Sequence, residues 1–174
     1  MAISLKLYVT DVSTDEKIAV YVADATQDDL NATKNWQTNW TSEYALLLPN
    51  KVALRRKDDD ELLGLMSYFV DGKSLAVEII YVESADHSNA NLLRQQNKEK
   101  KYIGIAKALF AYAIDVSLKE GCDGVLIFKA KTTKLVNYYK TAFGAQSVGS
   151  YDPFRLVIWE DAAADIMMEF QEEG

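Results

Sequence analysis

The sequence predicts an α/β (α+β) fold in which a mixed central β-sheet is flanked by helices on both faces. Two patterns carry this prediction. Three β-like runs follow one another between residues 52 and 82 with turn signals between them, which is typical of a meander. Helical and β-like segments then alternate from residue 102 to residue 159, and such crossovers place helices against the faces of a sheet.

The first 50 residues predict two strands followed by one or two helices. Apolar residues alternate over residues 3–9, as expected for a strand, and residues 17–23 form a second β-like run. Thr26 can cap a helix whose first turn carries two aspartates, because carboxylates complement the positive end of the helix dipole. Residues 36–49 are aromatic and leave open a second short helix or a loop.

The meander is the clearest unit. Residues 52–56 and 62–70 predict two strands, and the pair Asp71-Gly72 predicts a hairpin because both residues tolerate the positive φ values of tight turns. Residues 74–82 predict a third strand that is apolar on both faces except at Glu78. A strand buried on both faces belongs in the middle of a sheet.

The second half of the chain predicts helix, strand, helix and strand. A polar insertion at about residues 85–100 precedes it and indicates a long loop or a partly helical excursion. Apolar residues then recur at helical spacing from Tyr102 to Val116, and Gly121 is suited to end that helix. The remaining segments are a strand over residues 125–130, a helix capped by Thr132 or Thr133 and closed by Gly144, a strand over 155–159 and a short terminal helix over 161–174.

The composition excludes several classes of function. The length of 174 residues suits a single domain over residues 1–174. A net charge of −7 repels phosphate backbones, so we expect no nucleic-acid partner. One cysteine and one histidine leave no internal disulfide and no His-rich metal site. The longest apolar run is too short to span a bilayer, and the start of the chain lacks a secretory pattern; we therefore expect a cytoplasmic protein without a membrane partner.

A candidate anion-binding site lies where the strongest helix begins. The first N–H groups of a helix have no intrahelical acceptor, and the helix dipole attracts anions to that end. Gly104 lacks the Cβ that would block the approach of a phosphate, and Ala106 is nearly as small. A small residue in a helix also often serves only close packing, and this alternative stays open. The candidate cofactor-binding stretch is Lys101, Tyr102, Ile103, Gly104, Ile105 and Ala106.

This stretch resembles the pyrophosphate-binding motif of the GNAT (GCN5-related) N-acetyltransferases, which runs Gln/Arg, two residues, Gly, one residue, Gly/Ala. Lys101, Gly104 and Ala106 occupy the three defined positions, with Lys101 keeping a cation where the family has Gln or Arg. The resemblance implies a GNAT-like sheet and acetyl-CoA as cosubstrate, without a metal. It also implies that the main chain at Val82 and Glu83 holds the acyl arm.

Two further residues are candidates for catalysis through the same resemblance. Glu78 lies in the segment Glu-Ile-Ile-Tyr, which looks like the GNAT strand whose Glu acts through water as general base. A Glu that is hydrogen-bonded to a neighbouring strand or an Arg is the alternative. Tyr139, with Tyr138 in reserve, matches the GNAT helix whose Tyr protonates the departing CoA thiolate. A Tyr pair packed against the sheet is the alternative.

The function implied is an N-acetyltransferase that moves an acetyl group from acetyl-CoA directly to an amine of unknown identity. The rival interpretations are a non-catalytic GNAT-fold module that binds CoA or a protein, and a different phosphate- or nucleotide-binding α/β protein. The aromatic set Trp36, Trp40 and Tyr44 either lines an acceptor pocket or packs in the core. A homodimer is also left open.

Overall fold

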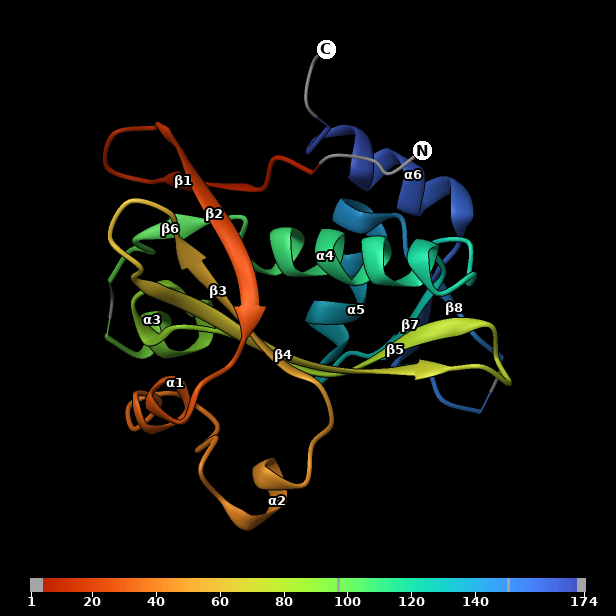
Figure 1. The fold of residues 1–174 in the computed structure, drawn as a ribbon, viewed down its shortest axis with the longest axis horizontal. Helices are drawn as coiled ribbons and strands as arrows, with labels where there is room; N and C mark the ends of the chain where they lie inside the picture. Colours follow the sequence, from red (N-terminus) through yellow and green to blue (C-terminus); the bar gives the residue numbers. More distant parts are fainter. Residues whose placement is uncertain (1–4, 97, 150, 172–174) are drawn as a thin grey trace. The chain divides into compact units, whose positions relative to one another are not determined.

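The computed structural model describes residues 5–96, 98–149 and 151–171. Within this part of the chain, nine strands form one mixed sheet in the order β6-β1-β2-β3-β4-β5-β7-β9-β8 (Figure 1). The strands are β1 (Tyr8–Asp11), β2 (Lys17–Asp24), β3 (Lys51–Arg56), β4 (Leu62–Asp71), β5 (Ala76–Ser84), β6 (Tyr102–Ile103), β7 (Leu126–Lys129), β8 (Gln146–Ser147) and β9 (Arg155–Ile158). The helices are α1 (Gln27–Asn31), α2 (Glu43–Leu46), η1 (Asp86–Ser88), α3 (Ala90–Gln96), α4 (Ile105–Lys119), α5 (Thr133–Phe143) and α6 (Glu160–Met168).

The chain divides into two compact units. The N-terminal unit holds residues 6–67 and 81–109, and the C-terminal unit holds residues 68–80 and 110–171 together with Leu5. Strands β4 and β5 and helix α4 contribute residues to both units. The mixed α/β fold class predicted from the sequence is confirmed.

In the N-terminal unit an antiparallel ladder runs through β6, β1, β2, β3 and β4. Its core contains the fully buried side chains Trp40, Leu54, Leu63, Leu65, Met66, Tyr102 and Leu109. Helix α1 begins as predicted, because Thr26 accepts a hydrogen bond from the Asp29 N–H and the Asp29 carboxylate accepts one from the Thr26 N–H. Such a reciprocal capping box satisfies two donors that the helix leaves unpaired.

In the C-terminal unit β7 pairs parallel with β5 and antiparallel with β9, so the sheet is mixed. Its core contains Phe110, Ile114, Leu126, Leu156 and Ile158. Thr132 caps α5 by accepting from the Leu135 N–H, and Gly144 ends the helix in the left-handed region at φ 69°. Both boundaries were predicted because caps depend on neighbouring residues alone.

Two strand boundaries differ from the prediction. The first strand begins at Tyr8, where its pairing with β2 starts, and its pairing with β6 starts at Thr10. Leu5 makes an isolated bridge with Gln171. Residues 3 and 4 of the predicted strand lie outside the described residues. The hairpin between β4 and β5 is confirmed, but the positive φ of 52° falls at Leu75. Asp71 Oδ1 instead accepts from the N–H groups of the two residues before Leu75, so the strand starts only at Ala76.

Two ambiguous segments take definite forms. Residues 36–49 are loop apart from α2, which Ser42 caps by accepting from the Ala45 N–H. The polar insertion contains η1 and α3 and then enters β6. Tyr102 therefore lies in a strand, and the prediction that the long helix includes it is wrong. The reason is that Tyr102 and Ile103 pair with β1, a partner that periodicity along one segment does not reveal.

Candidate functional site

The candidate anion-binding segment is a tight connection between β6 and α4. Gly104 has φ 95°, a conformation that L side chains rarely adopt, and its carbonyl accepts the hydrogen bond of the Ala108 N–H at 3.0 Å. Gly104 thus precedes the first helical residue. The N–H groups of Ile105 and Ala106 occupy the first turn, where helix geometry provides no acceptor. Gly104 is required here by its backbone conformation, since a Cβ would meet only the Val9 Cα at 3.9 Å.

A second glycine holds the start of α4 against the sheet. Gly64 on β4 is buried, and a Cβ at this position would lie 2.8 Å from Ile105 Cγ2 and 3.2 Å from Leu109 Cδ1. It would also lie 3.1 Å from the carbonyl oxygen of Glu83 on β5. The absent side chain lets the helix end approach the sheet closely, which is a recognised role of glycine inside a strand. An isolated Gly within a predicted strand was the available signal in the sequence.

Lys101 and Tyr102 belong to a polar cluster that holds β6. Lys101 Nζ lies 2.9 Å from Glu61 Oε1, and the Tyr102 hydroxyl donates to the same oxygen at 2.9 Å. The Tyr102 hydroxyl also accepts from Arg56 Nη1 at 2.6 Å. Burial raises the pKa of the Glu61 carboxyl, but the bonds from Lys101 and Tyr102 outweigh this and hold the pKa below its usual value. The Lys101 cation, expected beside phosphates, is thus paired with Glu61.

The main chain of the same two residues is also engaged. The Lys101 N–H donates to the His87 carbonyl at 2.9 Å, and the Tyr102 N–H donates to Ser88 Oγ at 3.0 Å. The predicted binding stretch therefore divides into two parts. Lys101 and Tyr102 are held by the insertion, while the first-turn N–H groups, which have no acceptor within the helix, belong to the residues that follow Gly104.

Glu83 at the end of β5 fixes the loop between α1 and α2. Its side chain is 4% exposed, and its carboxylate accepts from Gln37 N at 2.7 Å and Thr38 N at 3.2 Å. The indole N–H of Trp40 donates to it at 3.1 Å. A buried carboxylate needs such donors because desolvation is costly. The side chain of Glu83 is thus structural, and Val82 beside it is half-buried.

The structure separates the three aromatic residues for which the sequence left open a place in an acceptor pocket or in the core. Trp40 is fully buried and packs edge-on against Tyr81, with ring centroids 5.5 Å apart. Trp36 is also buried, whereas Tyr44 is 63% exposed. The core interpretation is therefore confirmed for Trp36 and Trp40 and is wrong for Tyr44.

In the C-terminal unit, Glu78 is half-buried on β5 and lies opposite Ile127 of β7 in the parallel register. Val77 and Ile79 on either side of it are buried. Because side chains alternate along a strand, the carboxylate lies on the face opposite these two residues. No ion pair or hydrogen bond of its side chain is seen within the described part of the chain.

Tyr139 on α5 lies in an aromatic cluster. Its ring stacks on Phe110 with centroids 5.6 Å apart and meets Phe128 and Phe143 edge-on at 5.0 and 5.4 Å. The residue is 8% exposed, and burial raises the pKa of its phenol to about 12. Tyr138, the reserve candidate, is 50% exposed. The Tyr139 ring thus packs as expected if its role is structural. The raised pKa keeps its phenol protonated at neutral pH.

Comparison with solved structures identifies the fold. An acetyltransferase of the GNAT family from Listeria monocytogenes superposes with a TM-score of 0.52 and 11% identity, covering 87% of this chain and 98% of that one. A spermidine N-acetyltransferase chimera from Vibrio cholerae and a second source gives 0.52 and 12%, covering 84% and 98%. The AtaTR protein bound to acetyl-CoA gives 0.51 and 14%, covering 84% and 97%. The chain has the GNAT fold.

Sequence comparison alone does not reach this result. No family model matches the chain, and no curated protein matches it by sequence. Three groups that hold β6 and the start of α4 in place were not predicted: the missing side chain of Gly64, the carboxylate of Glu61 and the guanidinium of Arg56. Each contacts a residue at least 40 positions away in the chain, which is Ile105 for Gly64 and Tyr102 for both Glu61 and Arg56.

The described residues contain neither a metal-ligand cluster nor a membrane-spanning helix. No group of three or more His, Cys, Asp or Glu side chains in this part of the chain could hold a metal ion. None of the helices described there is long and apolar enough to cross a membrane.

Proposed function

We propose that the protein is an acetyl-CoA-dependent N-acetyltransferase that transfers the acetyl group directly to an amine. The observation that carries the proposal is the start of α4. A glycine at φ 95° directly precedes a 15-residue helix and follows β6, which pairs with β1. The N–H groups in the first turn of that helix have no acceptor within the helix. Such a helix end favours a pyrophosphate through its N–H groups and its dipole.

The chemistry follows from the groups available. An amine attacks the thioester carbonyl, the C–N bond forms, and the C–S bond breaks with release of the CoA thiolate. Main-chain N–H groups near Val82 and Glu83 would polarise the carbonyl, and positioning of the two reactants would supply much of the acceleration. Glu78 would accept the ammonium proton through water, and Tyr139 would return a proton to the thiolate.

Ligand-dependent stabilisation tests this proposal. A ligand that binds only the folded state raises the melting temperature, and at one hundred times Kd the gain is about 2.7 kcal/mol. We expect acetyl-CoA to stabilise the chain and ATP and NAD to do so less at equal concentration. Release of CoA thiol on addition of amines would then measure transfer. No shift with millimolar acetyl-CoA would refute the proposal.

A pair of substitutions locates the site. Gly104→Glu places a carboxylate at the helix start, so we expect acetyl-CoA affinity to fall more than tenfold through like-charge and steric conflict. Gly104→Ala is the matched control, because it imposes the same backbone strain at φ 95° without the charge. Kd values in both variants that equal that of the unmodified protein would show that the anion does not bind at this helix end.

A non-catalytic CoA-binding module is the second candidate, and two observations favour it. Lys101 is paired with Glu61, and Tyr139 packs among three phenylalanines. Under this alternative acetyl-CoA binds but no CoA thiol is released with any amine. Under the proposed function, Glu78→Gln lowers turnover most at low pH and preserves acetyl-CoA affinity.

A further inference from the structure

The half-buried ring of His87 packs against β6, the strand that precedes α4. It meets the ring of Tyr102 edge-on, with ring centroids 5.5 Å apart. Its Nδ1 lies 2.7 Å from Ser88 Oγ, and the same buried oxygen accepts the Tyr102 N–H at 3.0 Å. Ser88 therefore links the imidazole to the main chain of β6.

The hydrogen bonds around the ring fit a neutral imidazole. The main chain of Leu62 acts as an acceptor that raises the pKa of His87, although its geometry falls short of a regular hydrogen bond to the buried Nε2. Because Nδ1 faces Ser88, we assign the ring proton to Nε2 and the Ser88 hydroxyl proton to the bond with Nδ1. Ser88 Oγ then donates to His87 and accepts from Tyr102.

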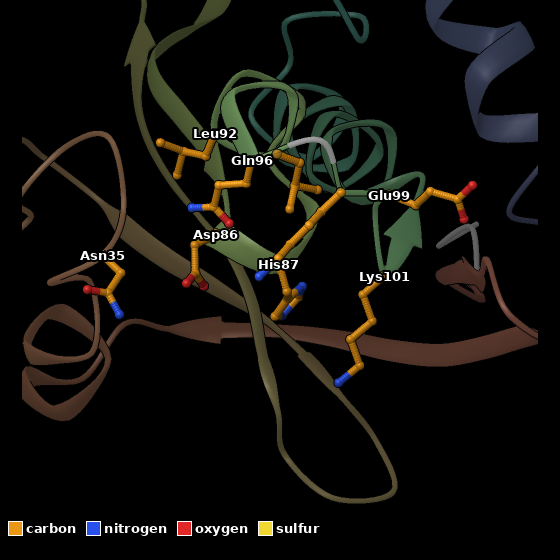
Figure 2. A pocket seen from close by; sticks show the side chains of 9 residues that line it. Asn35, Asp86, His87, Leu92, Gln96, Glu99 and Lys101 are labelled. Carbon is orange, nitrogen blue, oxygen red and sulfur yellow. The ribbon is translucent and has the colours of Figure 1, made fainter.

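The charged groups around the ring come from three elements. Asp86 lies on η1 with His87, Lys101 directly precedes Tyr102 of β6, and Glu61 directly precedes β4. Figure 2 shows the His87 ring between the side chains of Asp86 and Lys101. Burial has the largest effect and lowers the pKa of His87 below its ordinary value of 6.5, and Lys101 lowers it further, whereas the two carboxylates raise it. The ring is therefore neutral at pH 7.

Protonation of Nδ1 would reverse one of these hydrogen bonds. The new N–H must donate to Ser88 Oγ, so the hydroxyl proton has to turn away from the ring. No second acceptor for that proton lies within hydrogen-bond distance in the described part of the chain. A buried donor without an acceptor is costly, so the serine or the ring must move. Either movement disturbs the bond to the Tyr102 N–H, two residues before Gly104.

We propose that His87 is a positioning residue: its neutral imidazole, acting through Ser88, holds β6 and the start of α4, and protonation of the ring loosens both. For acetyl-CoA binding this inference rests on the proposed function, whereas for β6 itself it does not. Because burial lowers the pKa of His87, the contribution of the neutral ring is present above pH 6.5 and is lost as the pH falls through the lowered pKa. Acetyl-CoA should therefore bind more weakly at acidic pH.

NMR of the full chain without ligand tests the effect on β6. His87 is the single histidine of the chain, so its imidazole signals are assigned without ambiguity. As the pH falls from about 8 to about 5.5, the exchange protection of the Tyr102 N–H should fall with the same midpoint as the His87 titration. The Lys57 N–H, bonded to the Ala19 carbonyl, is the control and should not follow this midpoint. Tyr102 protection that is independent of the His87 titration would overturn the proposal.

Acetyl-CoA titrations test the effect on the proposed site. Between about pH 7.5 and 5.5 the Kd should rise about twofold or more beyond the rise in His87→Gln, whose amide does not titrate. By reciprocity, bound acetyl-CoA should lower the pKa of His87 in the unmodified protein, whereas a nearby anion acting by charge alone would raise it.

The two sets of results separate this inference from the proposed function. A His87 pKa that saturating acetyl-CoA raises or leaves unchanged would overturn the link between the ring and the site. Absence of acetyl-CoA binding at pH 7.5 would instead refute the proposed function, and the Tyr102 exchange measurement would still decide the role of His87.

Discussion

Replacing Gly64 by Ala would test whether close packing of α4 on the sheet positions the helix end that we propose binds acetyl-CoA. The added Cβ would lie 2.8 Å from Ile105 Cγ2, where ordinary contact begins at 3.4 Å. One neighbour is the fixed carbonyl of Glu83 at 3.1 Å, so the Cβ cannot simply move toward β5. The start of α4 must therefore shift or Ile105 must change its rotamer.

The energy follows from two opposing effects. Overpacking of a filled core typically costs about 1–3 kcal/mol. Alanine in place of a strand glycine returns about 0.5–1 kcal/mol, because the unfolded chain has less freedom to lose. The difference between these ranges is about 0–2.5 kcal/mol, and we expect Gly64→Ala to destabilise the protein by about 1 kcal/mol, near its middle. A displaced helix end should also weaken acetyl-CoA binding.

Urea denaturation followed by circular dichroism measures the stability, and calorimetry measures the acetyl-CoA Kd. Gly72→Ala is the matched control, because a Cβ there meets nothing within 4 Å and its φ is not positive. The reasoning is refuted if Gly64→Ala is as stable as Gly72→Ala and binds acetyl-CoA with the same Kd.

Three further predictions concern the buried polar groups. Glu83→Gln should cost about 2–3 kcal/mol in urea denaturation and alter the near-ultraviolet signal of Trp40, because the charged acceptor of three N–H groups is lost. Because burial raises the pKa of Tyr139 to about 12, the contribution of its neutral phenol to stability is complete below pH 10 and is lost as the pH rises through 12. Between pH 10 and 12 the Tyr139→Phe variant should therefore lose about 2–3 kcal/mol less stability than the unmodified protein. Equal losses in the two proteins would contradict the burial of the phenol. Lys101→Met should raise the acetyl-CoA Kd less than tenfold, since Glu61 holds this cation, and a larger loss would mean that Lys101 leaves Glu61 when the ligand binds.

The parts of the fold that could be predicted from the sequence are those governed by neighbouring residues. The cap at Thr26 and the helix end at Gly144 depend on side chains and backbone freedom within a few positions, and both were correct. The hairpin after β4 was also correct, although its left-handed residue is Leu75. An Asp71 side chain that caps the turn moves the strained position to the end of the loop.

The parts that could not be predicted depend on partners far along the chain. Tyr102 continues the apolar periodicity of α4, so sequence periodicity assigns it to the helix. Its pairing with Asp11, across 91 positions, pulls it into a strand, and its hydroxyl binds Arg56 and Glu61. The role of Glu83 also depends on distant residues, because its carboxylate holds the loop by accepting hydrogen bonds from N–H groups within residues 37–40. A single sequence contains no signal for either contact.

The structure changes the interpretation of the candidate motif at residues 101–106. Lys101 matches the motif position that carries Gln or Arg, yet its ammonium is paired with Glu61 and its N–H with the His87 carbonyl. These bonds hold β6 in register with β1, which sets the direction in which Gly104 opens onto α4. The polar insertion thus supplies the two acceptors that hold β6 just before the helix, the His87 carbonyl and Ser88 Oγ. Removing the Ser88 hydroxyl, which accepts the Tyr102 N–H, would therefore disturb the proposed anion site without changing any residue of the motif.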